Sequence, residues 1–389
     1  MTEQKHSKLT ALLFCGIVMA ITAASDSLRG VFLPQMRESF SLTEPQASRI
    51  IMISYIGNLL FLSVGGRLSD RLPKKRFLCG VLLLWSAALC TYVLTENYYV
   101  LLAMMMISMG GSTLISTTVN LITPMLFASP AMMVSIFNFL QGAGITVSQN
   151  VGGRFTDSLK GWHTANLIIL ALAAVCILLL FTLKLPEPER TEKKRSSVIS
   201  VIKDPAAILL ILICGFYFVA EHGLMNWLTS YGSEHLGFTV DRSAFFLSLF
   251  FGGITVGRLV FAPLIDRLGI FRSLLIWSAA GATLYTAGMA LGRQGMWVIG
   301  ASGIAFSILY PMLVMLIGKF FDPSEAGSVT GLILSIATFF DIGFNAFFGS
   351  LVEYAGYGKA IIVLPVSAVL FCVMLYVLKF TVKRSKDIT

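Results

Sequence analysis

Charged side chains are scarce in this sequence. Aspartate, glutamate, lysine and arginine make up 13% of its 389 residues, and 56% of the residues are hydrophobic. Soluble domains have about 25% charged residues, because charges cover the surface that faces water. Their scarcity excludes an ordinary soluble protein and a disordered chain. The formal net charge of +9 does not indicate a nucleic-acid binder, because the basic residues do not lie on a soluble face.

Motifs for disulfides, metals and enzyme chemistry are also missing from the sequence. The six cysteines all lie in apolar runs, and none forms a CxxC pair or a Cys/His cluster. We therefore expect neither a disulfide framework nor a metal site. The sequence contains no H-E-x-x-H and no G-x-S-x-G, which disfavours an enzyme, so we expect no catalytic residues and no cofactor.

A cleavable signal peptide is not expected. The first apolar run continues to Pro34 and contains Asp26 and Arg29, so it is too long and too polar for a signal-peptide core. The sequence also has no N-x-S/T site for glycosylation, which favours the inner membrane of a bacterium.

Long apolar runs without charge are abundant, for example 77–94 and 206–220. A helix needs about 20 apolar residues to span a bilayer, whereas a membrane β-barrel would alternate apolar and polar residues. The pattern therefore predicts an all-α membrane protein with twelve transmembrane helices. The expected spans are 9–35, 46–66, 77–95, 98–126, 131–154, 163–184, 205–231, 243–265, 271–291, 295–320, 326–351 and 359–382.

One long loop divides the predicted spans into two sets of six. It opens with Pro186 and Pro188, which cannot continue a helix, and it is rich in charged residues. We therefore expect an N-terminal six-helix bundle over 1–184, a cytoplasmic linker over 185–204 and a C-terminal six-helix bundle over 205–389.

The distribution of lysine and arginine predicts the orientation in the membrane. If both termini are cytoplasmic, 21 of the 29 basic residues fall on the cytoplasmic side, and Arg29 lies within a span. Such a bias is the pattern of the positive-inside rule. The remaining seven are Arg37, Arg49, Arg154, Lys160, Arg242, Arg293 and Lys359.

The two halves share an internal repeat with one offset of 196 residues. The matching pairs are Asp70 with Asp266, Arg71 with Arg267, Gly153 with Gly349, Gln149 with Asn345, Asp157 with Glu353 and Asp26 with His222. The repeat predicts two pseudo-symmetric bundles of common design. Transporters built in this way bind substrate between their halves near the middle of the membrane.

The segment from Gly66 to Arg76 resembles the G-x-x-x-D-R-x-G-R/K-R/K signature of the major facilitator superfamily, except that Pro73 replaces a glycine. The second half keeps that glycine as Gly269 but has Ala262 at the first position. The resemblance implies the major facilitator fold and a conformational gate at these loops. The expected gate residues are Gly66, Asp70, Arg71, Asp266 and Arg267.

Within that superfamily the chain resembles the fucose/glucose-permease-like proton symporters. The similar segments are Leu33-Pro34-Gln35, Phe40 to Thr43, Gln46-Ala47, Trp227 before Tyr231, Gly257-Arg258 and Tyr310-Pro311. Two positions depart from that group: Gly30 stands where it has a carboxylate, and Ser116 stands where it has a glutamate. The group's proton and sugar residues therefore do not transfer directly to this chain.

The fifth predicted span differs from that of drug/proton antiporters. These proteins resemble G-x-x-x-G-P-x-x-G-G there, whereas this chain has Ser148-Gln149 in place of Gly-Pro. Gly-Pro would kink a helix and remove a hydrogen-bond donor. The difference disfavours a drug antiporter.

Five ionisable residues lie deep in the predicted spans: Asp26, Arg29, Glu221, His222 and Asp341. Ionisable groups at this depth are costly and usually functional. We expect Asp341, Asp26 and Glu221, in this order of preference, to carry a coupled proton. His222 is a proton-sensitive group, since histidine titrates near neutral pH. The structural alternatives stay open: Asp26 can pair with Arg29 on one helix face, and His222 can simply join two helices.

Neutral polar side chains complete the expected substrate site. Amides offer donors and acceptors together, which suits hydroxyl groups, although they can equally hold helices together. The expected substrate-binding residues are Arg29, Asn120, Asn138, Gln141, His222, Asn226, Trp227, Tyr310 and Asn345, and Gln149 also belongs to this lining.

These patterns predict a proton-coupled symporter of a small polar solute, either a sugar or a sugar acid. The proton gradient would supply the energy, and the partners would be the solute, protons and the lipid bilayer, with no nucleic acid. The alternative is an efflux antiporter for amphipathic compounds. The resemblance implies a monomer.

Overall fold

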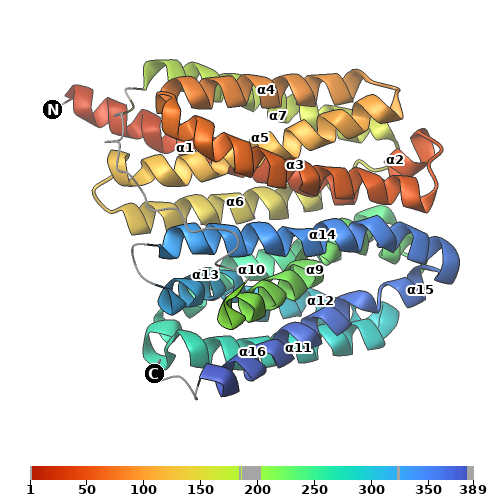
Figure 1. Cartoon of the computed structure of the whole chain (residues 1–389). Coiled ribbons are helices and arrows are strands. Elements are labelled where there is room, and N and C mark those ends of the chain that lie inside the picture. Colours follow the sequence, from red (N-terminus) through yellow and green to blue (C-terminus); the bar gives the residue numbers. More distant parts are fainter. Residues whose placement is uncertain (1, 184, 186–202, 322–324, 383–389) are drawn as a thin grey trace. The chain divides into compact units, whose positions relative to one another are not determined.

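The computed structural model describes residues 2–183, 185, 203–321 and 325–382, and these residues form helices without any strand (Figure 1). The chain forms two compact units. The first comprises Met1–Arg190 and Thr239–Phe245, and the second comprises Thr191–Phe238 and Phe246–Thr389. We call them the N-terminal and the C-terminal unit and describe each by itself. The predicted boundary at 185–204 remains a prediction.

Helices account for almost all of both units. Those of the N-terminal unit are α1 (Thr2–Val31), α2 (Leu33–Ser39), α3 (Glu44–Arg71), α4 (Lys74–Leu94), α5 (Tyr98–Leu126), α6 (Pro130–Gly153) and α7 (Leu159–Thr182). The others are α9 (Pro205–Glu234), α10 (Val240–Leu268), α11 (Ile270–Ala290), α12 (Gly292–Phe306), α13 (Leu309–Phe320), α14 (Ala326–Ala355), α15 (Tyr357–Ala360) and α16 (Val363–Val382).

Ten helical segments within the described residues are long and apolar enough to cross a membrane. The helices α6 and α11 correspond to the other two predicted spans. Amides, serines and glycines lower the hydropathy of α6, and serines, threonines and glycines lower that of α11. Both helices still pack inside their units as the other spans do.

The first predicted span had an incorrect end: it was predicted to continue to residue 35, but α1 ends at Val31 and the chain turns into the short helix α2. The tenth and twelfth predicted spans correspond to the apolar segments Gly292–Phe320 and Tyr357–Phe380. Each of these two contains an internal break, between α12 and α13 and between α15 and α16. Hydropathy stays high through these breaks, so composition alone does not reveal them.

Side-chain caps begin several helices at the positions where the apolar runs start. Thr43 and Gln46 form a reciprocal capping box at the start of α3. Asn97 caps α5, and Asp204 accepts from the amides of the first turn of α9 just before Pro205. Such caps satisfy backbone amides that have no partner within the helix.

The two repeats make the corresponding turn differently. Gly269, before α11, has φ +79°, in the left-handed region that favours glycine. Pro73, before α4, has φ −53°, because its ring prevents a positive angle. The departure from the family signature at Pro73 therefore changes the local backbone, while a helix still follows in both halves.

Helix packing repeats between the units, as the offset of 196 residues predicts. In the N-terminal unit α1 packs against α6 and α7, and α4 packs against α5 and α7. In the C-terminal unit α9 packs against α14 and α16, and α11 packs against α12 and α16. Each unit therefore surrounds its first long helix in the same way.

Glycine permits the closest of these helix approaches. A Cβ at Gly144 in α6 would collide with the backbone carbonyl of Ala20 in α1, and one at Gly303 in α12 would collide with the carbonyl of Phe250 in α10. Small residues allow this approach between membrane helices. By contrast, a Cβ at Gly343 in α14 would meet no atom within 4 Å.

The variant Gly144→Ala should therefore destabilise the N-terminal unit, because α1 and α6 would have to move apart. Overpacking of this kind costs about 1–3 kcal/mol. Gly343→Ala is the matched control, and it should leave the melting temperature unchanged or raise it, since alanine favours helices. Thermal unfolding of the purified variants in detergent measures both. An unchanged melting temperature for Gly144→Ala would contradict the close approach.

Candidate functional site

The N-terminal unit contains a charged cluster between α1 and its neighbours. Asp26, half-buried in α1, accepts a hydrogen bond from the hydroxyl of Ser112 in α5. Arg29, one turn later in α1, is 2% exposed. The pairing of Asp26 with Arg29 stays a prediction, and Ser112 provides a hydrogen-bond partner of Asp26 from a second helix.

Aromatic and sulfur groups surround the guanidinium of Arg29. The guanidinium carbon lies 5.4 Å from the ring centre of Tyr55 in α3, and Nη1 lies 3.7 Å from the sulfur of Met109 in α5. A cation over an aromatic face gains up to about 2 kcal/mol where water is excluded. An aromatic ring and a thioether from two other helices therefore contact this guanidinium inside the unit.

Asn120 combines an unpartnered side-chain oxygen with a proline one turn later. Its Oδ1 is buried and has no hydrogen-bond partner among the described residues. Pro124, inside α5, has no N–H to donate to the main-chain carbonyl of Asn120. Acceptor groups therefore collect at this point of α5, which suits a ligand that carries hydroxyl or ammonium donors.

The amides predicted on the fifth span lie on α6. Asn138 and Gln141 are half-buried. Gln149 is fully buried, and neither of its amide atoms has a hydrogen-bond partner among the described residues. Its neighbour Ser148 shares a hydrogen bond of 2.7 Å with Ser27 in α1, so the serine that replaces the antiporter glycine joins two helices.

The C-terminal unit contains a hydrogen-bonded pair of a histidine and a buried aspartate, which is an ion pair when the histidine is protonated. Nδ1 of His222 in α9 lies 2.9 Å from Oδ2 of Asp341 in α14. The Asp341 side chain is 1% exposed and that of His222 is 28% exposed. The other carboxylate oxygen, Oδ1, has no hydrogen-bond partner among the described residues. A buried carboxylate therefore reaches the outside of the unit through a partly exposed imidazole.

Two asparagines, each one turn further along the same helices, support this ion pair. The side-chain amide of Asn226 donates to the carbonyl of His222 over 2.8 Å, and that of Asn345 donates to the carbonyl of Asp341 over the same distance. The indole of Trp227 donates to Oδ1 of Asn345 over 2.9 Å. Asn226, Trp227 and Asn345 are all fully buried.

Trp227 has no exposed face for stacking on a sugar ring in this conformation. Its ring packs against Phe348 at 4.6 Å and Tyr357 at 6.5 Å between centroids. The predicted direct contact of Trp227 with substrate remains untested, and its observed contacts fix the position of α14 against α9.

Glu221 lies in an aromatic environment on α9. It is 9% exposed. The Tyr285 hydroxyl donates to the main-chain carbonyl of its neighbour Ala220 over 2.9 Å, and Tyr217, one turn earlier on α9, stacks on Tyr310. Phenol hydroxyls can donate hydrogen bonds to a carboxylate or to a substrate. The sequence did not indicate that these three tyrosines lie near this part of α9.

Tyr310 is the exposed member of a stack of rings at the start of α13. Its ring centre lies 6.3 Å from that of Tyr217, with 21° between the planes, and 6.3 Å from that of Phe218. Phe218 in turn stacks on the imidazole of His222 at 5.0 Å. The side chain of Tyr310 is 36% exposed, so this stack extends from the ion pair to an accessible ring.

The break in the tenth span is held by Arg258 of α10. Pro311 cannot donate to the carbonyl of Ser307, which would accept its amide in a continuous helix. Nε of Arg258 donates to that carbonyl over 3.2 Å. A Cβ at Gly257 would lie only 2.5 Å from Oγ of Ser307. Gly257-Arg258 of α10 and the segment that contains Tyr310-Pro311 therefore meet at this break.

Several predicted residues fall outside this description. The gate side chains of Gly66, Asp70, Arg71, Asp266 and Arg267 lie outside the described residues, although their backbones belong to α3 and α10. No group of three or more metal-ligating side chains occurs within the part of the chain that was described.

Sequence reasoning found the ionisable residues but missed their partners. Ser112, Tyr55 and Met109 are ordinary residues of apolar runs, and no local pattern distinguishes them. The sequence analysis used Arg258 for the charge bias across the membrane and for the family resemblance, and it predicted no contact for this side chain. Its position inside the eighth predicted span, together with Pro311 inside the tenth, was the signal that could have indicated a structural contact.

Comparison with known proteins identifies the family. Residues 15–340 match the Major Facilitator Superfamily, and the chain belongs to this family. It is therefore a member of a superfamily of membrane transporters. The predicted family, the all-helical fold and its twelve-helix design are confirmed.

Individual relatives are distant. The human protein spinster homolog 1 is 27% identical over 197 residues, which are 49% of this chain; the chain spans only 37% of the length of that relative. The hexuronate transporter of Bacillus subtilis (strain 168) is 21% identical over 90% of this chain and 89% of its own. A structure of the E. coli fucose:proton symporter FucP is 18% identical, covers 98% of this chain and all of its own, and superposes with a TM-score of 0.69.

The contact between Arg258 and the broken span predicts a specific coupling. Arg258→Met should destabilise the C-terminal unit, because an unpaired buried carbonyl costs about 1–3 kcal/mol. In a Pro311→Ala background the loss should be smaller, since alanine at this position restores an amide donor for the carbonyl of Ser307. Thermal unfolding of the wild type, the two single variants and the double variant measures this coupling. The control cycle uses Arg272→Met, at an exposed position in α11, in place of Arg258→Met; its effect on stability should add to that of Pro311→Ala. If the effects of Arg258→Met and Pro311→Ala were also additive, the contact would be contradicted.

The pair of His222 and Asp341 should also be energetically coupled. His222→Gln and Asp341→Asn each remove one partner, and we expect a coupling of about 0.5–3 kcal/mol in a double-mutant cycle of unfolding. Thr255→Val is the control for His222→Gln, since the Thr255 hydroxyl donates to the carbonyl of Phe251 within its own helix α10. Its combination with Asp341→Asn should be additive. Equal coupling in both cycles would show that the ion pair contributes nothing specific.

Proposed function

We propose that this transporter is a proton-coupled symporter of a small polar solute, a sugar or a sugar acid. The carrying observation is the buried pair of Asp341 and His222, in which the carboxylate is 1% exposed and the imidazole is partly accessible. Carboxylates and histidines inside membrane proteins commonly form proton relays. Histidine changes its charge near neutral pH, which matches the range in which a coupling group must exchange its proton.

In the proposed cycle the proton is shared between Asp341 and His222. When His222 carries a proton, the pair is an ion pair; when it loses the proton, Asp341 loses its charged partner and the two helices α9 and α14 lose an attraction. Protonation therefore changes the free energy of the contact between these helices. Asp26 with Ser112 is the corresponding acid of the other half, and Glu221 among its tyrosines is a third candidate.

The polar groups support a hydroxyl-rich substrate. Asn120, Gln149 and Tyr310 offer acceptors and donors that the protein leaves unpartnered or accessible. Arg29 adds a positive charge that would bind the carboxylate of a sugar acid. The names of two distant relatives, the hexuronate transporter and the fucose:proton symporter, favour the same two classes of solute.

The proposal includes alternating access of the two halves, with Gly66, Asp70, Arg71, Asp266 and Arg267 at the gate. It also includes a monomer in the inner membrane of a bacterium, with both termini in the cytoplasm and the proton gradient as the energy source instead of a cofactor. The bias of lysine and arginine supports this orientation.

Proteoliposomes test the proposal directly. We expect radiolabelled glucuronate or fucose to accumulate when the interior is made alkaline, and a protonophore to abolish the accumulation. Asp341→Asn should lose this uphill uptake but keep the exchange of internal for external solute, because exchange needs no net movement of protons. Asp157→Asn, at an exposed residue between α6 and α7, is the control and should retain uphill uptake.

Three outcomes would contradict parts of the proposal. If both Asp341→Asn and Asp26→Asn retained uphill uptake, the assignment of the coupling acid would be wrong. If inward protons drove solute out of the vesicles, the protein would be an antiporter. If neither a sugar nor a sugar acid exchanged across the membrane, the substrate class would be wrong.

A further inference from the structure

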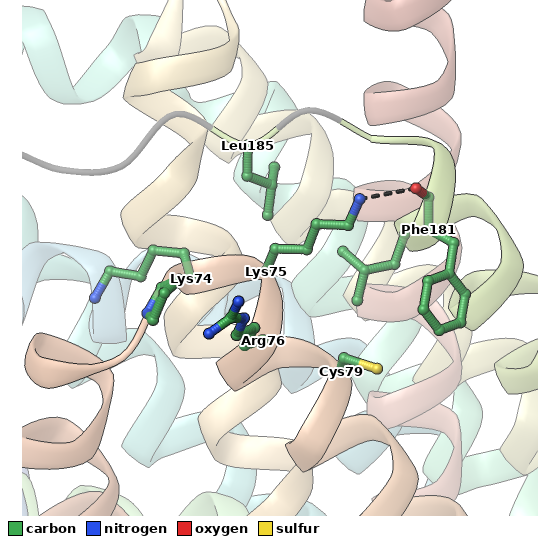
Figure 2. A pocket seen from close by; sticks show the side chains of 8 residues that line it. Lys74, Lys75, Arg76, Cys79, Phe181 and Leu185 are labelled. Carbon is green, nitrogen blue, oxygen red and sulfur yellow. Dashed lines mark hydrogen bonds between the residues drawn. The ribbon is translucent and has the colours of Figure 1, made fainter.

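A basic cavity lies in the N-terminal unit, away from the charged cluster around Asp26. It has a volume of about 560 Å³ and lies between the start of α4 and the end of α7 (Figure 2). Lys74, Lys75 and Arg76 of α4 line it together with Leu180, Phe181 and Leu185. The described lining residues include three cations and no acidic side chain, so the cavity attracts anions.

Lys75 builds the cavity as well as charging it. Its Nζ donates to the main-chain carbonyls of Phe181 and Leu183, each over 2.8 Å, and Figure 2 shows its side chain reaching across to Phe181. These carbonyls belong to the end of α7, where acceptors have no partner within the helix. The bond therefore holds α7 against α4, and Lys74 and Arg76 line the cavity beside it.

The two remaining cations differ in exposure. The Lys74 side chain is buried, with 6% exposure, whereas Arg76 is exposed. A guanidinium binds two oxygens of a phosphate at once through its planar donors. Arg76 is therefore the residue best suited to bind a phosphate group that enters from the membrane surface.

An apolar surface continues from the cavity along the same two helices. Leu83 and Leu84 on α4 are 53% and 44% exposed, and Leu178 and Phe181 on α7 are 66% and 64% exposed. On membrane-spanning helices such side chains face acyl chains. The cavity thus combines cations at the helix ends with an apolar surface further along, which a soluble anion would not use.

We propose that this cavity binds the headgroup of an anionic phospholipid, with its acyl chains lying on the exposed faces of α4 and α7. Basic pockets at the ends of membrane helices are suited to such headgroups. The distribution of lysine and arginine predicts that this end faces the cytoplasm. The lipid would then come from the cytoplasmic leaflet, and it would stabilise the packing of α4 on α7.

The repeat supplies a matched control. Arg76 corresponds to Arg272 at the offset of 196 residues, and both side chains are exposed near the start of a helix. Arg76→Gln and Arg272→Gln therefore remove the same charge from equivalent sites, but only Arg76 lines the cavity. Cys79→Phe is a second variant that fills the cavity and keeps all three cations.

Native mass spectrometry and thermal unfolding in detergent, with dioleoyl phosphatidylglycerol as the probe, test the proposal. We expect this lipid to bind and raise the melting temperature of the wild type and of Arg272→Gln. Arg76→Gln should bind it about fivefold more weakly, the contribution of one basic residue near an anionic surface, and Cys79→Phe should also lose binding.

Two comparison ligands distinguish a site for an anionic lipid from a site for a soluble anion. Glycerol 3-phosphate has the charge without the acyl chains, and dioleoyl phosphatidylcholine has the chains without the net charge. If glycerol 3-phosphate stabilised the protein as much as the lipid, the site would be one for soluble anions. If phosphatidylcholine bound equally, or if Arg76→Gln and Arg272→Gln behaved alike, the proposal would be overturned.

Discussion

The absence of water from the bilayer core is the constraint on which this structure depends. Each backbone polar group inside a span must find its hydrogen-bond partner within the protein. The tenth span shows the consequence, because Pro311 removes a donor from the helix and Arg258 of α10 provides one from outside it. Gly257 lets the two helices come close enough for that contact. A break in a membrane helix is thus stabilised by one residue pair on a neighbouring helix.

The same constraint governs the interior charges. Asp26 and Arg29 lie on α1, the first long helix of its unit, and Glu221 and His222 lie on α9; Ser112 of α5 and Asp341 of α14 are their partners from other helices. The partners differ: Asp26 accepts a hydrogen bond from the hydroxyl of Ser112, whereas His222 contacts the carboxylate of Asp341. A buried ion pair is costly to break, so a change in its protonation alters how strongly two helices attract each other. This link between proton and packing is the physical basis of the proposed coupling.

Apolar runs and charge scarcity predicted the helices, because the membrane imposes their length and composition. Composition did not predict the breaks after Val31 and between α12 and α13. Hydropathy stays high at these points, and the backbone geometry determines where the helix ends. The depth of Asp26, His222 and Asp341 was predicted from counting along the spans. Their contacts with Ser112 and one another depend on how distant segments pack, which a single sequence does not encode locally. For the same reason, the sequence did not show which group the side chain of Arg258 contacts.

In the proposed coupling, the pair of Asp341 and His222 exchanges a proton with the surrounding water. Infrared difference spectroscopy of the purified protein, between about pH 5 and about pH 8 where histidine titrates, detects this exchange. We expect a change in carboxyl or imidazole bands in the wild type that is missing from both Asp341→Asn and His222→Gln. An identical difference spectrum in the wild type and the two variants would contradict it.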